Sequence, residues 1–234
     1  MLQKGKLYVT NLLNLVFPKV CIYCVKNLYA GEEFLCVACT KDLPLVPWNK
    51  GDCFPVSNQL KGKANFIYTY SLYYYFKAGK TGKLIKEIKY RSNKELGISL
   101  GRRFGERLKE NPTIKEIDFI VPVPLHPRRM LKRGYNQAEL IAVGMSEILS
   151  IPVKNNTFKR VKYSSSQTKK GREGRANSSQ GIFEMVDSPL LEGKHLLIID
   201  DVITTGATME SMFSAVNLPS NVKISVAALC SPYE

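Results

Sequence analysis

The feature that most constrains the fold is the alternation of apolar runs with amphipathic segments in the second half of the chain. The run IDFIVPV (117–123) reads as a buried strand, and residues 135–150 after it have helical spacing. A second run, HLLIID (195–200), precedes a helix expected from about Thr208 to Val216, and KISVAALC (223–230) supplies a last strand. Strands that alternate with helices predict a parallel sheet covered by helices on both faces. The fold class is therefore α/β.

The first half of the chain is less regular. Residues 64–77 alternate aromatic and small side chains, as strands and hairpins do, and residues 84–110 have apolar residues at helical spacing. Residues 43–63 are rich in Pro, Gly and Lys and indicate an irregular connector. The polar, basic segment 159–180 suits an extended hairpin, a flap that closes over a site, or a solvated loop. We expect an N-terminal helix and cysteine module in residues 1–50 and an α/β domain in residues 60–234.

Two adjacent acids and a loop of small residues follow the apolar run at 195–200. Asp200 and Asp201 come first, and residues 204–208 (TTGAT) lead into the expected helix. Ligands of open α/β sheets bind at this edge, where small residues and a helix N-terminus suit a phosphate. Carboxylates suit sugar hydroxyls or the outer coordination sphere of Mg²⁺. The block indicates a phosphorylated-sugar site, although acids at a strand end can also cap a helix or face water.

Four cysteines form two C-x-x-C pairs near the N-terminus, Cys21 with Cys24 and Cys36 with Cys39. Four thiolates at this spacing are typical of a closed structural zinc site, and so small a module has too little core to fold alone. A redox pair and an iron–sulfur cluster are the alternatives. Cys53 and Cys230 have no such partner and are interpreted as ordinary residues.

The motif V-x-T-T-G-A-T (202–208), together with the apolar run before it, resembles the phosphoribosyl pyrophosphate signature of type I phosphoribosyltransferases. With the N-terminal cysteines and the segment VPVPLHPRRMLKRGYNQAELIA (121–142), the chain resembles the ComF family of competence-associated, phosphoribosyltransferase-like proteins. The resemblance implies a type I phosphoribosyltransferase fold, a parallel twisted sheet flanked by helices, with a small N-terminal zinc-finger module.

The resemblance also implies roles for individual residues. Asp200 and Asp201 would be the catalytic pair that holds the ribose hydroxyls. The 5′-phosphate would lie on Val202, Thr204, Thr205, Gly206, Ala207 and Thr208. Substrate or pyrophosphate would be contacted by Arg133, Asn136, Gln137 and Arg175, the last in a flexible-loop block that also includes Gln167 and Asn177.

The chemistry expected of such a site is electrostatic. Displacing pyrophosphate from a sugar carbon develops charge that Mg²⁺, Arg and Lys can stabilise. Of the two histidines, His195 precedes a strand at the end away from the loop and is interpreted as structural, and His126 is not favoured as a base. We expect an enzyme, a phosphoribosyltransferase that binds phosphoribosyl pyrophosphate or a related sugar phosphate with Mg²⁺, in competence and DNA uptake or in nucleotide metabolism. The alternatives are a single-stranded DNA-binding competence factor and a ligand-sensing regulator without turnover.

Charge and hydropathy indicate the partners. Lys and Arg total 34 against 20 acids, a formal charge of +14, which favours phosphates or nucleic acid. The aromatic run at 68–76 suits either base stacking or strand packing, and we favour packing. The resemblance adds DNA-uptake machinery, including a helicase. Residues 1–19 are interpreted as a short amphipathic helix rather than a signal peptide, and no run is long enough to span a membrane. We therefore expect a cytoplasmic protein without membrane insertion.

Overall fold

The centre of the molecule is a four-stranded sheet in which every pairing is parallel. A computed structural model describes residues 18–48, 52–63, 65–161, 182–186, 188–216, 219 and 221–233. The strands follow the order β1 (Thr69–Tyr74), β6 (Lys223–Ser231), β5 (His195–Val202) and β2 (Phe119–Pro122). The predicted α/β class is confirmed. The predicted N-terminal helix before Pro18 lies outside the described residues, as do Gln167, Arg175 and Asn177 in the expected flap.

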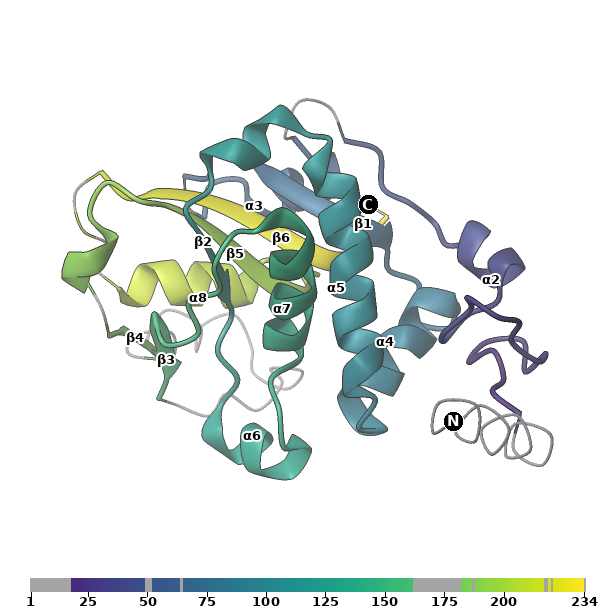
Figure 1. Cartoon of the computed structure of the whole chain (residues 1–234). Helices are drawn as coiled ribbons and strands as arrows, with labels where there is room; N and C mark the ends of the chain where they lie inside the picture. Colours follow the sequence, from purple (N-terminus) through teal and green to yellow (C-terminus); the bar gives the residue numbers. More distant parts are fainter. Residues whose placement is uncertain are drawn as a thin grey trace, which may run out of the picture.

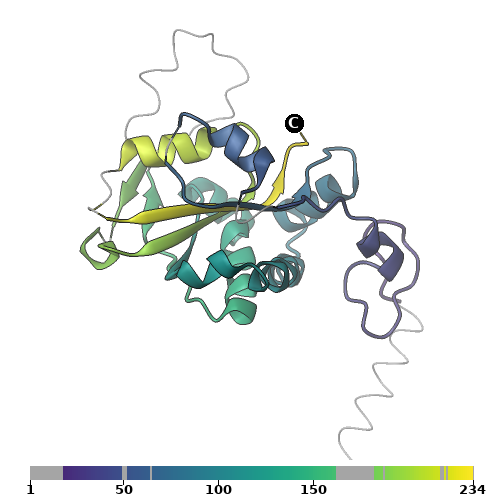
Figure 2. The same cartoon turned by 90° about the horizontal axis from the view of Figure 1, so that it is seen from above.

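Alternate residues of β5 fill two separate cores, one on each face of the sheet. Leu197 and Ile199 face the core covered by α4 (Lys80–Tyr90), α5 (Lys94–Lys109) and α7 (Gln137–Leu149). Leu196 and Ile198 face the core covered by α3 (Phe54–Leu60) and α8 (Ala207–Ala215). Figures 1 and 2 show these two layers of helices on opposite sides of the sheet. Both faces are covered, which explains why β5 is apolar at each position from Leu196 to Ile199.

Close packing between α5 and α7 builds much of the first core. A Cβ atom added at Gly101 would lie 2.2 Å from the carbonyl oxygen of Ile141, and one at Gly144 would lie 2.0 Å from that of Ile98. Real Cβ atoms do not approach so closely, so the two helices touch through these glycines. The contact holds α7 against the sheet and thereby sets the position of its N-terminus.

The structure specifies the elements of the first half of the chain and corrects one of them, the connector. The segment 84–110 forms two helices, because α4 ends at Tyr90 and Asn93 caps α5 by accepting a hydrogen bond from the Leu96 N–H at 3.1 Å. Of the two expected forms, strand and hairpin, the aromatic run forms the single strand β1. Its Tyr70 and Tyr73 are fully buried, which confirms the packing interpretation for them. The expected irregular connector contains α3.

The remaining elements are short. A separate antiparallel pair, β3 (Phe158–Arg160) and β4 (Phe183–Met185), flanks residues 162–181, which agrees with the hairpin alternative for the base of that segment. The others are α2 (Val37–Lys41), α6 (Pro127–Arg133) and the 3-10 helices η1 (Pro112–Glu116) and η3 (Ser188–Leu191). Among the described residues, no helix has both the length and the apolar character needed to cross a membrane.

Candidate functional site at the carboxyl edge of the sheet

The two adjacent acids lie within β5 rather than beyond its end, because pairing with β6 continues to Val202. Successive side chains of a strand point to opposite faces, so the two carboxyl groups meet different neighbours. Asp201 is buried and lies 2.9 Å from the ammonium group of Lys89, in the last turn of α4. Asp200 is half-buried, and its Oδ1 accepts a hydrogen bond from the Asp201 N–H at 2.7 Å. The acid pair is therefore positioned by the sheet and partly neutralised from the helix.

Burial and the neighbouring charge of Asp201 raise the pKa of Asp200 to about 7, although Lys89 and Arg160 act in the opposite direction. The pair consequently holds a proton near neutral pH. Burial acts to lower the pKa of Lys89, but the negative charges of Asp201 and Asp200 outweigh it and raise that pKa above its ordinary value. Lys89 therefore remains a cation beside the acids.

The loop after β5 turns into α8 at Gly206. Gly206 is the N-cap of α8 and adopts a left-handed conformation with φ of +70°. A Cβ atom at this position would lie 2.6 Å from the carbonyl oxygen of Gln59 in α3, so glycine is required both by the turn and by the close approach. Thr204, Thr205 and Ala207 are exposed, and Thr208 is half-buried. The first N–H groups of a helix have no intrahelical acceptor, so those of α8 can serve an anion.

Lys63 adds a positive charge to this loop, which the sequence motifs did not indicate. Its ammonium group donates to the carbonyl oxygen of Gln59 at 2.7 Å and to that of Thr205. It therefore connects the end of α3 to the turn. Val202, which we expected to contact phosphate, is the last residue of β5 and packs against the first core. Its role with phosphate stays a prediction.

The segment RGYNQ brings α6 and α7 to the same edge. Asn136 caps α7 by accepting from the Ala138 N–H at 3.2 Å, and its Nδ2 donates to the carbonyl oxygen of Val123 at 3.0 Å. The Val123 N–H in turn donates to the carbonyl oxygen of Ile199, one residue before the acids. Both polar ends of Asn136 thus serve to dock α7 at the site.

Arg133 is half-buried at the end of α6. Its Nη1 donates to Oε1 of Gln137 at 2.8 Å, and its charge acts on Lys89. Gln137 is buried, and its Nε2 is a buried donor without a hydrogen-bond partner among the described residues. Arg133 and Gln137 are therefore brought together beside the acids, whereas Arg175 lies outside the described residues.

The charge of Arg160, which the sequence motifs did not single out, also acts on Asp200. Burial and the charge of Arg129 lower the pKa of Arg160 on β3, while Asp200 opposes this. Burial is the largest cause that lowers the pKa of His126, and the positive charges of Arg160, Arg128 and Arg129 lower it further. The Nδ1 of His126 accepts from the Arg128 N–H at 3.1 Å, so this histidine is a neutral cap of α6. The only sequence signal was the dense basic composition of these loops.

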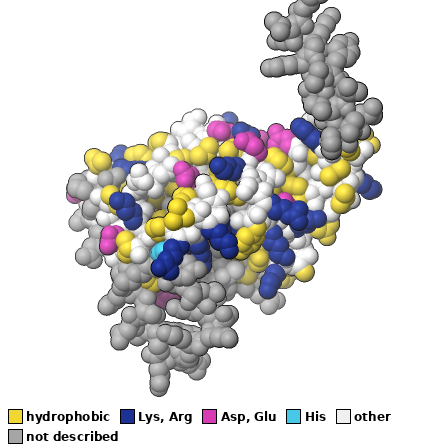
Figure 3. All heavy atoms as spheres, turned by 90° about the horizontal axis from the view of Figure 1, so that it is seen from below, with side chains coloured by type: hydrophobic (Ala, Val, Ile, Leu, Met, Phe, Trp, Pro, Cys, Tyr) yellow, Lys and Arg dark blue, Asp and Glu magenta, His cyan; other side chains and the backbone are white. Residues whose placement is uncertain are grey.

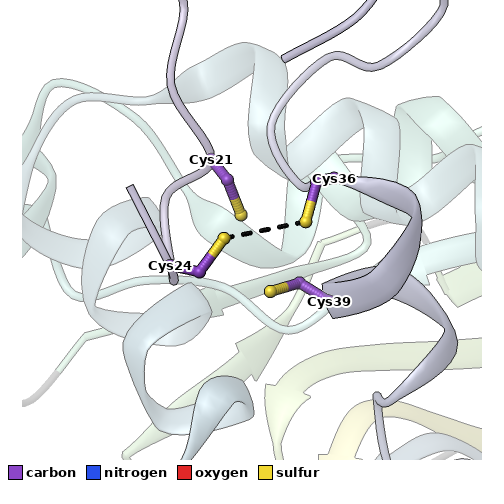
Figure 4. A group of neighbouring side chains, drawn as sticks. All are labelled: Cys21, Cys24, Cys36 and Cys39. Carbon is purple, nitrogen blue, oxygen red and sulfur yellow. Dashed lines mark hydrogen bonds between the residues drawn. The ribbon is translucent and has the colours of Figure 1, made fainter. Parts of the chain in front are cut away.

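The four cysteines converge on one point, as Figure 4 shows. Their sulfur atoms all lie within 4.8 Å of one another, and those of Cys24 and Cys36 are 3.7 Å apart. Tetrahedral zinc with bonds of about 2.3 Å requires sulfur separations of about 3.8 Å. Although burial acts to raise it, backbone hydrogen bonds from Cys24, Cys36 and Tyr23 lower the pKa of the Cys21 thiol to about 6, which favours the thiolate. The predicted four-cysteine cluster is confirmed, and its donor set is compatible with a structural zinc ion.

The residues that we interpreted as structural have structural surroundings. Cys53 and Cys230 are buried apart from the cluster, and burial raises the pKa of the Cys53 thiol to about 11. His195 begins β5 at the opposite edge of the sheet, where its Nε2 lies 2.8 Å from the hydroxyl of Ser225. Burial lowers the pKa of His195, so its imidazole is neutral at pH 7. It lies at the opposite end of β5 from the two acids.

Comparison with known proteins agrees with this architecture. Residues 136–232 match a family model described as a phosphoribosyl transferase domain. The chain is 28% identical to Competence protein F of Haemophilus influenzae over 204 residues, covering 82% of this chain and 88% of that protein. It is 25% identical to Competence protein ComFC of Bacillus subtilis over 191 residues, which cover 82% of this chain and 75% of that protein. It is 26% identical to DNA utilization protein YhgH of Salmonella typhimurium over 150 residues, which cover 63% of this chain and 65% of that protein.

Proposed function

We propose that this chain, a phosphoribosyltransferase-type protein of the ComF family, binds phosphoribosyl pyrophosphate or a related sugar phosphate at the carboxyl edge of its sheet. The observation that carries the proposal is the placement of the acid pair directly before a glycine-capped helix N-terminus, with Lys63, Lys89 and Arg133 close by. Carboxylates accept hydrogen bonds from sugar hydroxyls, and the turn and the cations attract phosphates.

Each part of the ligand has a matching part of the site. Asp200 and Asp201 hold the ribose hydroxyls, and the N–H groups and hydroxyls of residues 204–208 hold the 5′-phosphate. Arg133, Arg160 and Lys89 face the negative charge of the leaving pyrophosphate. Bound Mg²⁺ would supply further charge neutralisation to the pyrophosphate, with Asp200 and Asp201 as its outer-sphere partners. Asn136 keeps α7 docked, and Gln137 orients Arg133.

The cysteine cluster holds a structural zinc ion in this proposal, with Cys21, Cys24, Cys36 and Cys39 as ligands. A four-thiolate site leaves no open position, so the metal stabilises its module and takes no part in the reaction. A role in competence and DNA uptake, a cytoplasmic location and partners among DNA-uptake proteins, including a helicase, belong to the same proposal. Their support is the likeness to proteins named for competence and for DNA utilization.

Calorimetry tests the ligand site. Phosphoribosyl pyrophosphate should bind the zinc-loaded chain in the presence of Mg²⁺. Asp201→Asn should weaken binding at least about tenfold, because hydrogen bonds to a charged group are worth about 1.5–3 kcal/mol. Asp52→Asn is the control, since that carboxylate accepts from the hydroxyl of Thr69 away from the acid pair. Unchanged affinity in a folded Asp201→Asn protein would refute the assignment.

The same site could serve an enzyme or a ligand-sensing regulator, and turnover distinguishes them. Release of pyrophosphate from phosphoribosyl pyrophosphate, measured with and without single-stranded DNA, identifies a transferase or hydrolase. Binding without release identifies a sensor. Neither histidine is placed to act as a base, because His126 is engaged as a helix cap and His195 lies at the other edge of the sheet. Catalysis would therefore rest on electrostatic stabilisation and orientation.

A further inference from the structure

Lys63 lies where the end of α3 meets the loop after β5. The helix is anchored in the second core by Val56 and Leu60, which are both buried. Gly62 follows the helix with a left-handed φ of +73°, so the chain turns back at this point. The Lys63 N–H then donates to the carbonyl oxygen of Leu60 at 3.0 Å. The backbone of Lys63 is therefore held against the end of α3.

The side chain of Lys63 joins two carbonyl groups from segments far apart in the chain. Its ammonium group donates to the carbonyl oxygen of Gln59 at 2.7 Å and to that of Thr205. The first bond is one that a lysine near a helix C-terminus commonly makes. The second is not needed to cap α3, because Thr205 belongs to the loop after β5. Lys63 thus acts on this loop as well as on its own helix.

The loop is also packed tightly against α3 at the next residue. Gly206 is buried, and a Cβ atom there would lie 2.6 Å from the carbonyl oxygen of Gln59 and 3.0 Å from Cδ2 of Leu60. This contact leaves the loop no room to move toward the helix. The ammonium group of Lys63 therefore holds the Thr205 carbonyl on the side of the loop that faces α3.

Holding the Thr205 carbonyl sets the direction of the following N–H group. A trans peptide is planar, and its C=O and N–H bonds point in opposite directions. The peptide between Thr205 and Gly206 is trans, so the Gly206 N–H points away from Lys63. Among the described residues, none accepts a hydrogen bond from this N–H. It is a donor whose direction depends on the bond between Lys63 and Thr205.

We propose that Lys63 is a positioning residue of the phosphate loop, which keeps the Gly206 N–H directed at the 5′-phosphate by holding the Thr205 carbonyl against α3. The inference rests on the proposed function, because it assigns the part of that site that recognises the phosphate. A donor that is already oriented needs no rearrangement when the anion binds, so the affinity for the phosphorylated sugar rises.

Nuclear magnetic resonance tests the orientation of this peptide without a ligand. The sequence has two Thr-Gly pairs, 81–82 and 205–206, so selective labelling of threonine carbonyl carbons and glycine nitrogens isolates the amide signals of Gly82 and Gly206. Lys63→Met removes the donor at nearly the same side-chain length and should shift the Gly206 signal. Gly82 is the internal control, because its N–H donates to the carbonyl oxygen of Phe76 at 3.1 Å.

Calorimetry with ribose 5-phosphate tests the consequence for binding on the full, zinc-loaded chain. Lys63→Met should weaken binding about 10- to 100-fold, which is the worth of one hydrogen bond to a charged group. Lys63→Arg keeps a cationic donor and should restore most of the affinity. The affinity for inorganic pyrophosphate with Mg²⁺ should stay unchanged in Lys63→Met, because the proposed function assigns that group to other residues. A folding defect would instead lower both affinities.

A second lysine separates this role from general attraction for anions. The chain has a formal charge of +14, and Figure 3 shows many Lys and Arg side chains on one face of the molecule. Lys61→Met removes an equal charge from an exposed side chain at the C-cap of α3 and should leave the ribose 5-phosphate affinity nearly unchanged. The loss in Lys63→Met should persist at about 1 M sodium chloride, where charges more than about 3 Å apart are screened.

Three results would overturn the role of Lys63: an unshifted Gly206 signal in Lys63→Met, equal losses of ribose 5-phosphate affinity in Lys63→Met and Lys61→Met, or a loss that disappears at high salt. Each of them leaves the wild-type ligand site intact. If the wild-type chain bound neither ribose 5-phosphate nor phosphoribosyl pyrophosphate, the proposed function itself would be refuted, and this role with it.

Discussion

At the scale of single residues, Asp200 and Asp201 show how neighbours in sequence acquire different chemistry. Strand alternation directs Asp201 to Lys89, whereas Asp200 accepts from the backbone and experiences both burial and the charge of Asp201. A carboxyl group whose proton is held more tightly in the folded chain makes folding less favourable as pH rises. The site therefore carries a stability cost that a ligand or its metal ion can relieve.

Asp200→Asn should consequently stabilise the protein at high pH. The pKa of Asp200 lies near 7 in the folded chain and about 3.9 in the unfolded chain, so the folded state binds more protons between these values and wild-type stability falls as pH rises through this window. The Asn side chain has no proton to lose, so the stability of the variant relative to wild type should grow from about pH 4 to pH 7 and reach at most on the order of 4 kcal/mol. Urea denaturation at pH 5 and pH 8 measures it.

Asp118→Asn is the control with the opposite sign. Asp118 lies at the other edge of the sheet, where it accepts a hydrogen bond from the His195 N–H and another from the ammonium group of Lys194. These two interactions lower the pKa of Asp118, the first more than the second. Its stabilising contribution is present above the ordinary pKa and is lost as pH falls, so this variant should be destabilised at pH 8 and approach the wild type in acid. An identical pH dependence in wild type and Asp200→Asn would contradict the account of the acid pair.

At the scale of elements, the contact between α5 and α7 determines where the site residues lie. Gly101 and Gly144 let the helices touch, and α7 then presents Asn136 and Gln137 at the carboxyl edge of the sheet. The sequence showed two helical segments here, but their mutual distance depends on which residues meet at the crossing. Binary patterning identifies the buried face of a helix and does not specify how near its partner approaches.

Gly144→Ala should destabilise the chain by about 1–3 kcal/mol, because the added methyl group overpacks the contact with the Ile98 carbonyl. Helix propensity alone predicts that this substitution raises the free energy of unfolding by about 1 kcal/mol. The sign of the measured change therefore distinguishes overpacking from propensity. Chemical denaturation measures it, with Ser146→Ala in the same helix as the control. A stabilised Gly144→Ala protein would show that the helices do not touch as described.

At the scale of the whole molecule, the cysteine module is attached to the sheet rather than suspended from a linker. Ile22, Phe34 and Leu35 pack against the first core. Residues after the module pair with the edge of the sheet, where the Val46 N–H donates to Leu72 at 3.1 Å and the Tyr74 N–H donates to Pro44 at 2.8 Å. Disorder in the module would therefore loosen the packing of this core. The boundary that we predicted between residues 50 and 60 stays a prediction.

Cys24→Ser should abolish stoichiometric zinc binding and lower the melting temperature by about 5–10 °C, since a loss of about 2–3 kcal/mol shifts a chain of this size by that amount. Elemental analysis and calorimetric melting measure the two effects. Cys53→Ser should retain one zinc ion per chain, because Cys53 is buried at the start of α3 away from the cluster. Full zinc content in Cys24→Ser would exclude the four-cysteine site.

The sequence by itself determined the features that depend on neighbouring residues. Apolar runs and helical spacing indicated β2, β5, β6, α7 and α8, the paired cysteines indicated their cluster, and Asp200, Asp201 and Gly206 stood out as one block. The family resemblance had already assigned Arg133 to the site, whereas the tertiary structure brought Lys63, Lys89 and Arg160 to that block. The tertiary structure also placed Tyr23 and Tyr90 at a basic depression of the surface and buried Tyr70 and Tyr73. The physical reason is range: backbone periodicity and turn chemistry are local, whereas a cation's partner is chosen by the packing of segments far apart in the chain.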